Sequence, residues 1–162
     1  MGVTRISYGA NLPVDRCKEA LEFLAESFMA GDPYNGGGFV ILNGLAFDDE
    51  GRAVPQETPY PGSNLFSLAS GGAIFVRDPF HKIVPEQLNG GEIHPFTKQD
   101  WELIRPYLEE NERLFGISIK NHVLMVDGKR KKPQEVYRTI KAVKLSVLAG
   151  KLQTDALDEW ED

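Results

Sequence analysis

The sequence predicts a mainly β domain, a short right-handed parallel β-helix (solenoid) capped by α-helices. The first observation is a double glycine that leads into a short apolar run, at Gly37-Gly38, Gly71-Gly72 and Gly90-Gly91. The first two pairs begin 34 residues apart and the last two 19, and 19 residues are about one coil of such a solenoid. The second observation is dense glycine and proline between 36 and 96, and the third is a helix pattern on either side of that stretch.

The glycine-rich stretch predicts short buried strands joined by tight turns. The runs 39–42 and 73–76 are rich in β-branched and aromatic residues, which suit buried strands. Glycine suits the corners, because it adopts positive φ angles without strain. Further strands are expected at 45–47 and 64–68, and weaker ones at 83–84 and 92–93. An extended, proline-rich surface loop is expected at 54–62.

A helix over 13–30 is predicted on the N-terminal side. Pro13 suits the first helical turn, and Asp15 adds a favourable charge there. Gly31-Asp32-Pro33 provides the stop. The apolar stripe at helical spacing comprises Cys17, Ala20, Leu21, Leu24, Ala25 and Phe28.

A second helix is predicted over 97–115. Thr97 and Asp100 form a capping box at its start, and Gly116 closes it. Pro106 falls inside the pattern, so we expect a kink or two abutting helical pieces. Beyond it we expect a strand at 123–126 turning at 127–128, a short helix at 133–140 and a strand at 142–148.

One domain is expected for residues 1–162. Its parts are an N-terminal helical segment (1–34), the glycine-rich β-solenoid core (35–96), a helical or mixed C-terminal cap (97–150) and an acidic tail (151–162). The net charge of −6 argues against general affinity for nucleic acid or anionic membranes, so neither is an expected partner. Cys17 is the only cysteine, which excludes an intrachain disulfide and favours the cytoplasm.

Candidate site residues are few. His81 and His94 flank one expected coil, with Asp78 and Arg77 nearby, and two histidines with a carboxylate are a familiar metal-ligand or acid–base set. Their spacing matches no known motif, so surface histidines and a structural ion pair at a corner are the favoured interpretation. The only basic run, 129–132, suggests a phosphate or nucleic-acid contact, but its place after a turn favours a solvated loop.

The segment 62–76, GSNLFSLASGGAIFV, resembles part of the glycine-rich C-terminal domain of the glutamate synthase large subunit, the GXGXG domain. In that family a small-residue Gly-Gly turn leads into a strand, and a further glycine turn follows about 19 residues later. Here Gly90-Gly91 stands at that distance, and the resemblance covers roughly 35–96.

The resemblance implies a β-helix that positions catalytic domains and supplies no catalytic residue. The expected function is therefore that of a non-catalytic structural or assembly subunit of a glutamate synthase-like oxidoreductase. Its expected partners are the catalytic chains of such a complex, or further copies of this chain in a homo-oligomer. No cofactor or metal is expected in this chain, whereas FMN and iron–sulfur clusters are expected on partner chains. The alternative is a standalone small-molecule- or metal-binding enzyme that uses His81 and His94, with Asp78 and Arg77.

Overall fold

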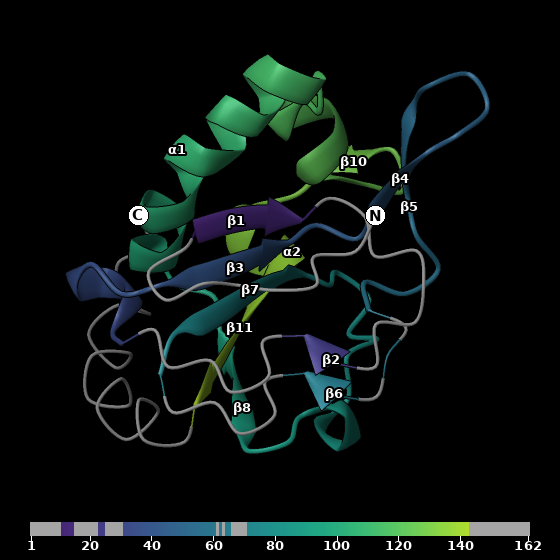
Figure 1. Ribbon diagram of the computed structural model, residues 1–162. Coiled ribbons are helices and arrows are strands. Elements are labelled where there is room, and N and C mark those ends of the chain that lie inside the picture. Colours follow the sequence, from purple (N-terminus) through teal and green to yellow (C-terminus); the bar gives the residue numbers. More distant parts are fainter. Residues whose placement is uncertain are drawn as a thin grey trace.

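The chain forms a small mixed α/β domain built on one five-stranded sheet. The computed structural model describes residues 11–14, 23–24, 31–60, 62, 64–65 and 71–142. The strand order is β1 (Asn11–Val14), β3 (Phe39–Leu42), β7 (Ala73–Arg77), β11 (Tyr137–Ala142) and β8 (Gly91–Pro95). Figure 1 shows these strands side by side, with α1 across one face. The described residues thus contain no solenoid, and the predicted β-helix is wrong.

The directions of the strands explain why the sequence predicted a solenoid and why no solenoid forms. β3 and β7 are parallel neighbours in which Phe39 faces Ala73 and Leu42 faces Val76, so the 34-residue step does mark a pair of adjacent strands. The third glycine pair leads into β8, which runs in the same direction as β7. However, β11 lies between the two and is antiparallel to both. The repeats therefore enter one open sheet and do not stack as coils, because the next partner of β7 comes from much later in the chain.

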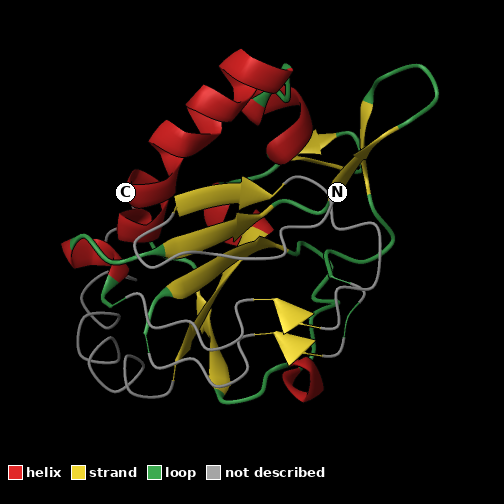
Figure 2. Cartoon of the chain, in the orientation of Figure 1, coloured by secondary structure: helices red, strands yellow, loops and turns green. Residues whose placement is uncertain are grey.

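The helix predicted over 97–115 is confirmed, but it covers a face of the open sheet and does not cap a solenoid (Figure 1). α1 (Lys98–Phe115) begins at the Thr97–Asp100 capping box and ends at Gly116, whose φ is +71°. The helix continues through Pro106, so the expected division into two pieces does not occur. Pro106 is exposed, so the carbonyl that loses its helical donor lies on the water-facing side. Figure 2 shows this helix as the main helical layer of the fold.

The core lies between α1 and the sheet. Ile104 and Leu108 of the helix are fully buried against Phe39 and Phe75, whose ring centroids are 5.6 Å apart in an edge-to-face arrangement. Phe96 extends this aromatic cluster and stacks on Tyr137 at 5.2 Å. β3 and the first four residues of β7 are buried on both faces, and their sequences are continuously apolar, as is usual for the centre of a parallel sheet.

Three local predictions need correction. Within the predicted helix 13–30, Pro13 and Val14 belong to β1 and Phe23–Leu24 forms strand β2; the other residues, Cys17 included, lie outside the described part. β1 is an edge strand of the sheet, a position where proline is tolerated because no ladder donor is lost. The expected helix at 133–140 stops at Val136, and the expected loop at 54–62 begins inside a strand.

The remaining elements are short and flank the sheet. No helix in the described segments is long and apolar enough to span a membrane. The flanking elements are β2 (Phe23–Leu24) paired with β6 (Asn64–Leu65), β4 (Leu45–Phe47) paired with β5 (Ala53–Pro55), β9 (Met125–Val126) paired with β10 (Lys129–Arg130), the 3₁₀ helices Pro33–Asn35 and Pro85–Gln87, the π-helix Ile119–Val123 and α2 (Pro133–Val136).

Candidate ligand site at the carboxyl edge of the sheet

Arg77 ends β7 and is buried, with 3% of its surface exposed. Its Nε donates to the carbonyl of Val123 at 2.8 Å, and its Nη2 donates to the carbonyls of Met125 at 2.9 Å and His122 at 3.5 Å. These acceptors belong to the π-helix and the residues just after it. Burial lowers the pKa of Arg77 from its ordinary value. The guanidinium therefore anchors the π-helix against the sheet.

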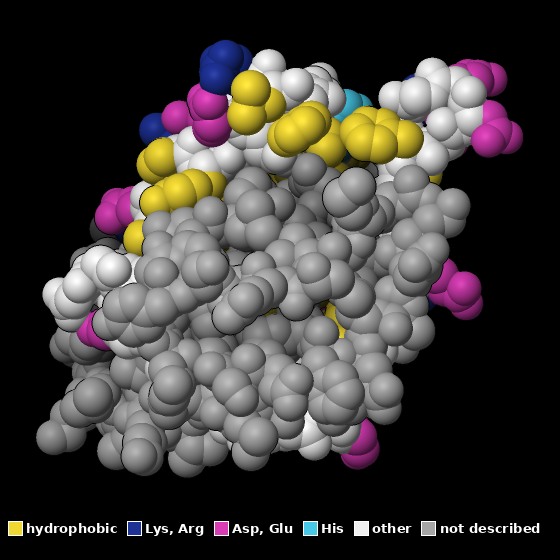
Figure 3. Space-filling view, viewed as in Figure 1, with side chains coloured by type: hydrophobic (Ala, Val, Ile, Leu, Met, Phe, Trp, Pro, Cys, Tyr) yellow, Lys and Arg dark blue, Asp and Glu magenta, His cyan; other side chains and the backbone are white. Residues whose placement is uncertain are grey.

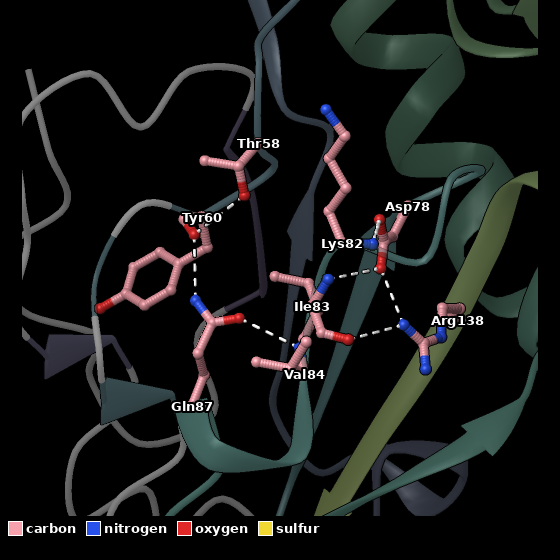
Figure 4. A network of polar contacts seen from close by, with 8 residues as sticks. All are labelled: Thr58, Tyr60, Asp78, Lys82, Ile83, Val84, Gln87 and Arg138. Atoms are coloured by element: carbon pink, nitrogen blue, oxygen red, sulfur yellow. Dashed lines mark hydrogen bonds and ion pairs between the residues drawn. The ribbon is translucent and has the colours of Figure 1, made fainter.

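Asp78 follows Arg77 and organises the next loop (Figure 4). Its carboxylate accepts from the backbone N–H groups of Lys82 at 2.7 Å and Ile83 at 2.9 Å. It also accepts from Nη1 of Arg138 at 2.8 Å, and the same nitrogen donates to the carbonyl of Ile83. With 1% exposure, Asp78 is a structural centre that fixes the backbone of 79–83 beside β11.

The two predicted histidines lie in different settings. His81 is exposed in the loop after β7, with φ of +54°, and its N–H donates to the Asp78 carbonyl at 3.2 Å. His94 lies on β8, opposite Thr139 of β11, with its Nε2 3.5 Å from a carboxylate oxygen of Glu92. The described residues contain no group of three or more histidine, cysteine or acidic side chains placed to hold a metal ion.

The predicted set of four therefore divides into separate contacts. Arg77 bonds to the π-helix, Asp78 to its own loop and Arg138, and His94 approaches Glu92. Within the set, the backbone N–H of His81 donates to the Asp78 carbonyl. The structure places these residues near the carboxyl ends of β7 and β8 without assembling a shared catalytic centre in the described part.

A pocket lies beside the same loop. Its volume is about 460 Å³, and we call it the Phe80 pocket. Phe80, which is 55% exposed, contributes an aromatic wall. The basic run contributes alternate residues, Lys129 and Lys131. The complete lining is Pro79, Phe80, Val126, Asp127, Lys129, Lys131 and Glu135.

The turn between β9 and β10 explains why the lysines reach this pocket. Asp127 and Gly128 have φ of +50° and +76°, the left-handed pair that a tight two-residue hairpin requires. The predicted turn at these residues is thus confirmed. Side chains alternate along an extended segment, so Lys129 and Lys131 line the pocket while Arg130 and Lys132 do not.

The electrostatics of this edge differ from those of the whole chain. Four consecutive basic residues, 129–132, stand on a protein of net charge −6. Two carboxylates, Asp127 and Glu135, also line the pocket, and Glu135 is partly engaged because it accepts from the Lys132 N–H at 2.8 Å. The lining itself thus holds two cations and two carboxylates, and the excess positive charge of segment 127–135 comes from Arg130 and Lys132, which do not line the pocket. This excess favours anions near the pocket.

A second polar cluster was not predicted from the sequence. Asp100 is fully buried, and its carboxylate accepts from the Thr97 N–H and the Thr139 hydroxyl, each at 2.9 Å, and from the Tyr34 hydroxyl. The Lys141 ammonium lies 4.9 Å from the centroid of the Tyr34 ring. We call these five residues the Asp100 cluster. The sequence signalled only its capping box, because the other members come from distant segments.

Burial shifts the pKa values of two members of the Asp100 cluster, Tyr34 and Lys141. Desolvation raises the pKa of Tyr34 well above its ordinary value, and the charge of Asp100 acts in the same direction. Desolvation also lowers the pKa of Lys141, while Asp100 and Asp32 oppose that shift. Since Asp100 already has three donors, its carboxylate is fully engaged within the cluster.

No protein-family model matches this chain, and neither the curated proteins nor the solved structures gave a match. These comparisons neither support nor refute the resemblance to the glutamate synthase GXGXG domain.

Proposed function

We propose that this chain is a binding module for small organic anions that carry a flat apolar part. The observation that supports the proposal is the Phe80 pocket, which an exposed aromatic ring and two lysines line together. A planar ring can stack on Phe80 while an anionic group contacts Lys129 and Lys131. The proposal keeps the small-molecule alternative drawn from the sequence but moves it to other residues.

The position of the pocket in the fold supports this proposal. Pro79 and Phe80 follow β7 directly, at the carboxyl end of a strand that is parallel to β3. In open α/β sheets, ligands bind outside the carboxyl ends of parallel strands, because the loops there converge. The pocket volume of about 460 Å³ falls in the range of small-molecule sites.

AMP is a suitable first probe, because it joins a planar base to a phosphate. We expect AMP to shift the amide NMR signals of Phe80 and of 126–131, and ribose 5-phosphate to bind more weakly because it lacks the base. The Lys129→Gln/Lys131→Gln variant should weaken AMP binding about tenfold through the loss of two charge-assisted contacts.

The chain supplies a matched control in Arg130→Gln/Lys132→Gln, which removes the same charge from the same segment but from residues that do not line the pocket. Equal weakening by both double variants would mean that AMP senses only the general positive field. AMP binding that survives Phe80→Ala unchanged would remove the stacking part of the proposal.

The assembly role implied by the resemblance stays a prediction, but the β-helix from which it was inferred is not found in the described residues. Exposed apolar side chains do occur: Leu114 and Phe115 at the end of α1 are 56% and 63% exposed. Figure 3 shows apolar side chains gathered along the upper rim of one face, over α1. Light scattering of the purified chain would report whether it self-associates.

A further inference from the structure

We propose a second binding site, for a single oxyanion group, in a small cavity at Arg77. This cavity has a volume of about 80 Å³ and shares two lining residues, Pro79 and Phe80, with the Phe80 pocket. Gly44 and Pro59 form part of its surface, and Lys82 contributes a second cation. Its size suits one carboxylate or phosphate group rather than a whole metabolite.

In the described part of the chain, no carboxylate is hydrogen-bonded to the buried guanidinium of Arg77. The guanidinium is 3% exposed, and its hydrogen bonds in the described part go to three neutral carbonyls with no carboxylate among them. A buried charge without a counterion is costly, and an anion bound beside it would relieve that cost. Arginine stays protonated at neutral pH, so the positive charge is permanent.

The π-helix leaves some of the N–H donors of Arg77 unused. An arginine side chain carries five N–H donors, of which two belong to Nη1. The bonds to the π-helix use Nε and Nη2, and Nη1 donates to none of the described residues. Arg77 lines the cavity, and a guanidinium edge matches the paired oxygens of a carboxylate or phosphate.

The carboxylates in the cavity wall do not cancel this charge. Asp78 accepts from Nη1 of Arg138 and from two backbone N–H groups, so its charge already has a partner. Lys82 donates to the backbone carbonyl of Glu57 at 2.7 Å, a neutral acceptor. Apart from Asp78, the charged residues of the lining are therefore two cations, Arg77 and Lys82, and one acidic residue, Glu57.

Anion-dependent stability tests the site without a known ligand. Ligand that binds only the folded state raises the melting temperature with concentration. We expect phosphate or acetate at low millimolar concentration to raise the melting temperature, and chloride at the same ionic strength to have no such effect. A response to phosphate alone would identify a phosphate group as the ligand, and a response to acetate alone a carboxylate. An equal response to all three salts would overturn the proposal.

Lys82→Gln tests the same site without touching the anchor of the π-helix. We expect the apparent affinity for the active anion to fall about threefold, as for the loss of one partly exposed charge contact. Arg77→Lys should abolish the response if it folds. If Arg77→Lys does not fold, Lys82→Gln still decides, because an unchanged response in that variant contradicts the site.

This test is independent of the Phe80 pocket. The Lys129→Gln/Lys131→Gln variant should keep the oxyanion response, and Lys82→Gln should keep its affinity for AMP. Loss of AMP binding with an intact oxyanion response would refute the Phe80 pocket alone. An intact AMP site without any oxyanion response would refute only the Arg77 site.

Discussion

Two polar regions on the same face of the sheet differ in how completely their groups are paired. The Asp100 cluster lies toward the start of the parallel strands, where Lys141 pairs with Ala73 of β7, and the Asp100 carboxylate has three donors. The carboxyl edge lies at the opposite end, where Arg77 faces Tyr137. There the sheet borders two cavities, and Arg77 keeps unused donors.

The difference indicates which region serves stability and which serves binding. A buried polar network with all partners present rigidifies a fold, and it offers nothing to a ligand. A charged group beside a cavity with donors to spare is the arrangement that a ligand completes. We therefore expect substitutions in the Asp100 cluster to change stability, and substitutions at the carboxyl edge to change binding.

Asp100→Ala gives the largest expected effect. It leaves three donors without their acceptor, two of them on buried threonines and one on the half-buried Tyr34, and it removes a charge near Lys141. We expect a loss of about 3–5 kcal/mol in the free energy of unfolding. Urea unfolding measures the change. Asp100→Asn, which keeps an acceptor oxygen, should lose less. A loss below about 1 kcal/mol for Asp100→Ala would show that the cluster is not a stabilising network.

Tyr34→Phe should have an intermediate effect of about 1–2 kcal/mol, since it removes one donor to Asp100. It should also change the alkaline limit of stability. The pKa of Tyr34 is raised in the folded protein, so the folded phenol stays protonated while the unfolded one ionises near pH ~10. Wild-type stability should therefore fall as the pH rises above about 10. In Tyr34→Phe this part of the decline should be absent, as chemical unfolding between pH 8 and ~11 would show.

Lys129→Gln/Lys131→Gln should have the smallest effect on stability. Lys129 is exposed and Lys131 half-buried, and surface charge changes lie within about 0.5 kcal/mol. The same variant should show the loss of AMP binding described above. A large destabilisation with unchanged binding would reverse the assignment of roles to the two regions.

The sequence predicted the elements whose signals are local. β3 and β7 are apolar runs after glycine pairs, α1 has its capping box at Thr97, and Asp127-Gly128 specifies its own turn. The strand order was not predictable in this way, because β11 is placed by pairing with strands far away in the sequence. Pro13 indicated a helix start, yet at a sheet edge the same residue fits a strand.

The candidate sites were predictable only in part. The basic run was recognised, but a solvated loop was favoured because its pocket partners, Pro79 and Phe80, come from another part of the chain. Arg77 and Asp78 were singled out as neighbours, whereas the structure directs their side chains to different partners. Nothing local joins Tyr34, Thr139 and Lys141 to Asp100, so that cluster required the fold itself.

The central place of β11 has a consequence for the newly made chain. β11 joins β7 to β8, and it is the last strand of the described sheet to be synthesised. Until residues 137–142 leave the ribosome, β7 presents an apolar strand, Ala73–Arg77, with one edge unpaired. Such an edge can recruit strands from other chains. The nascent protein can therefore misassemble with other chains until β11 pairs with β7 and closes the sheet.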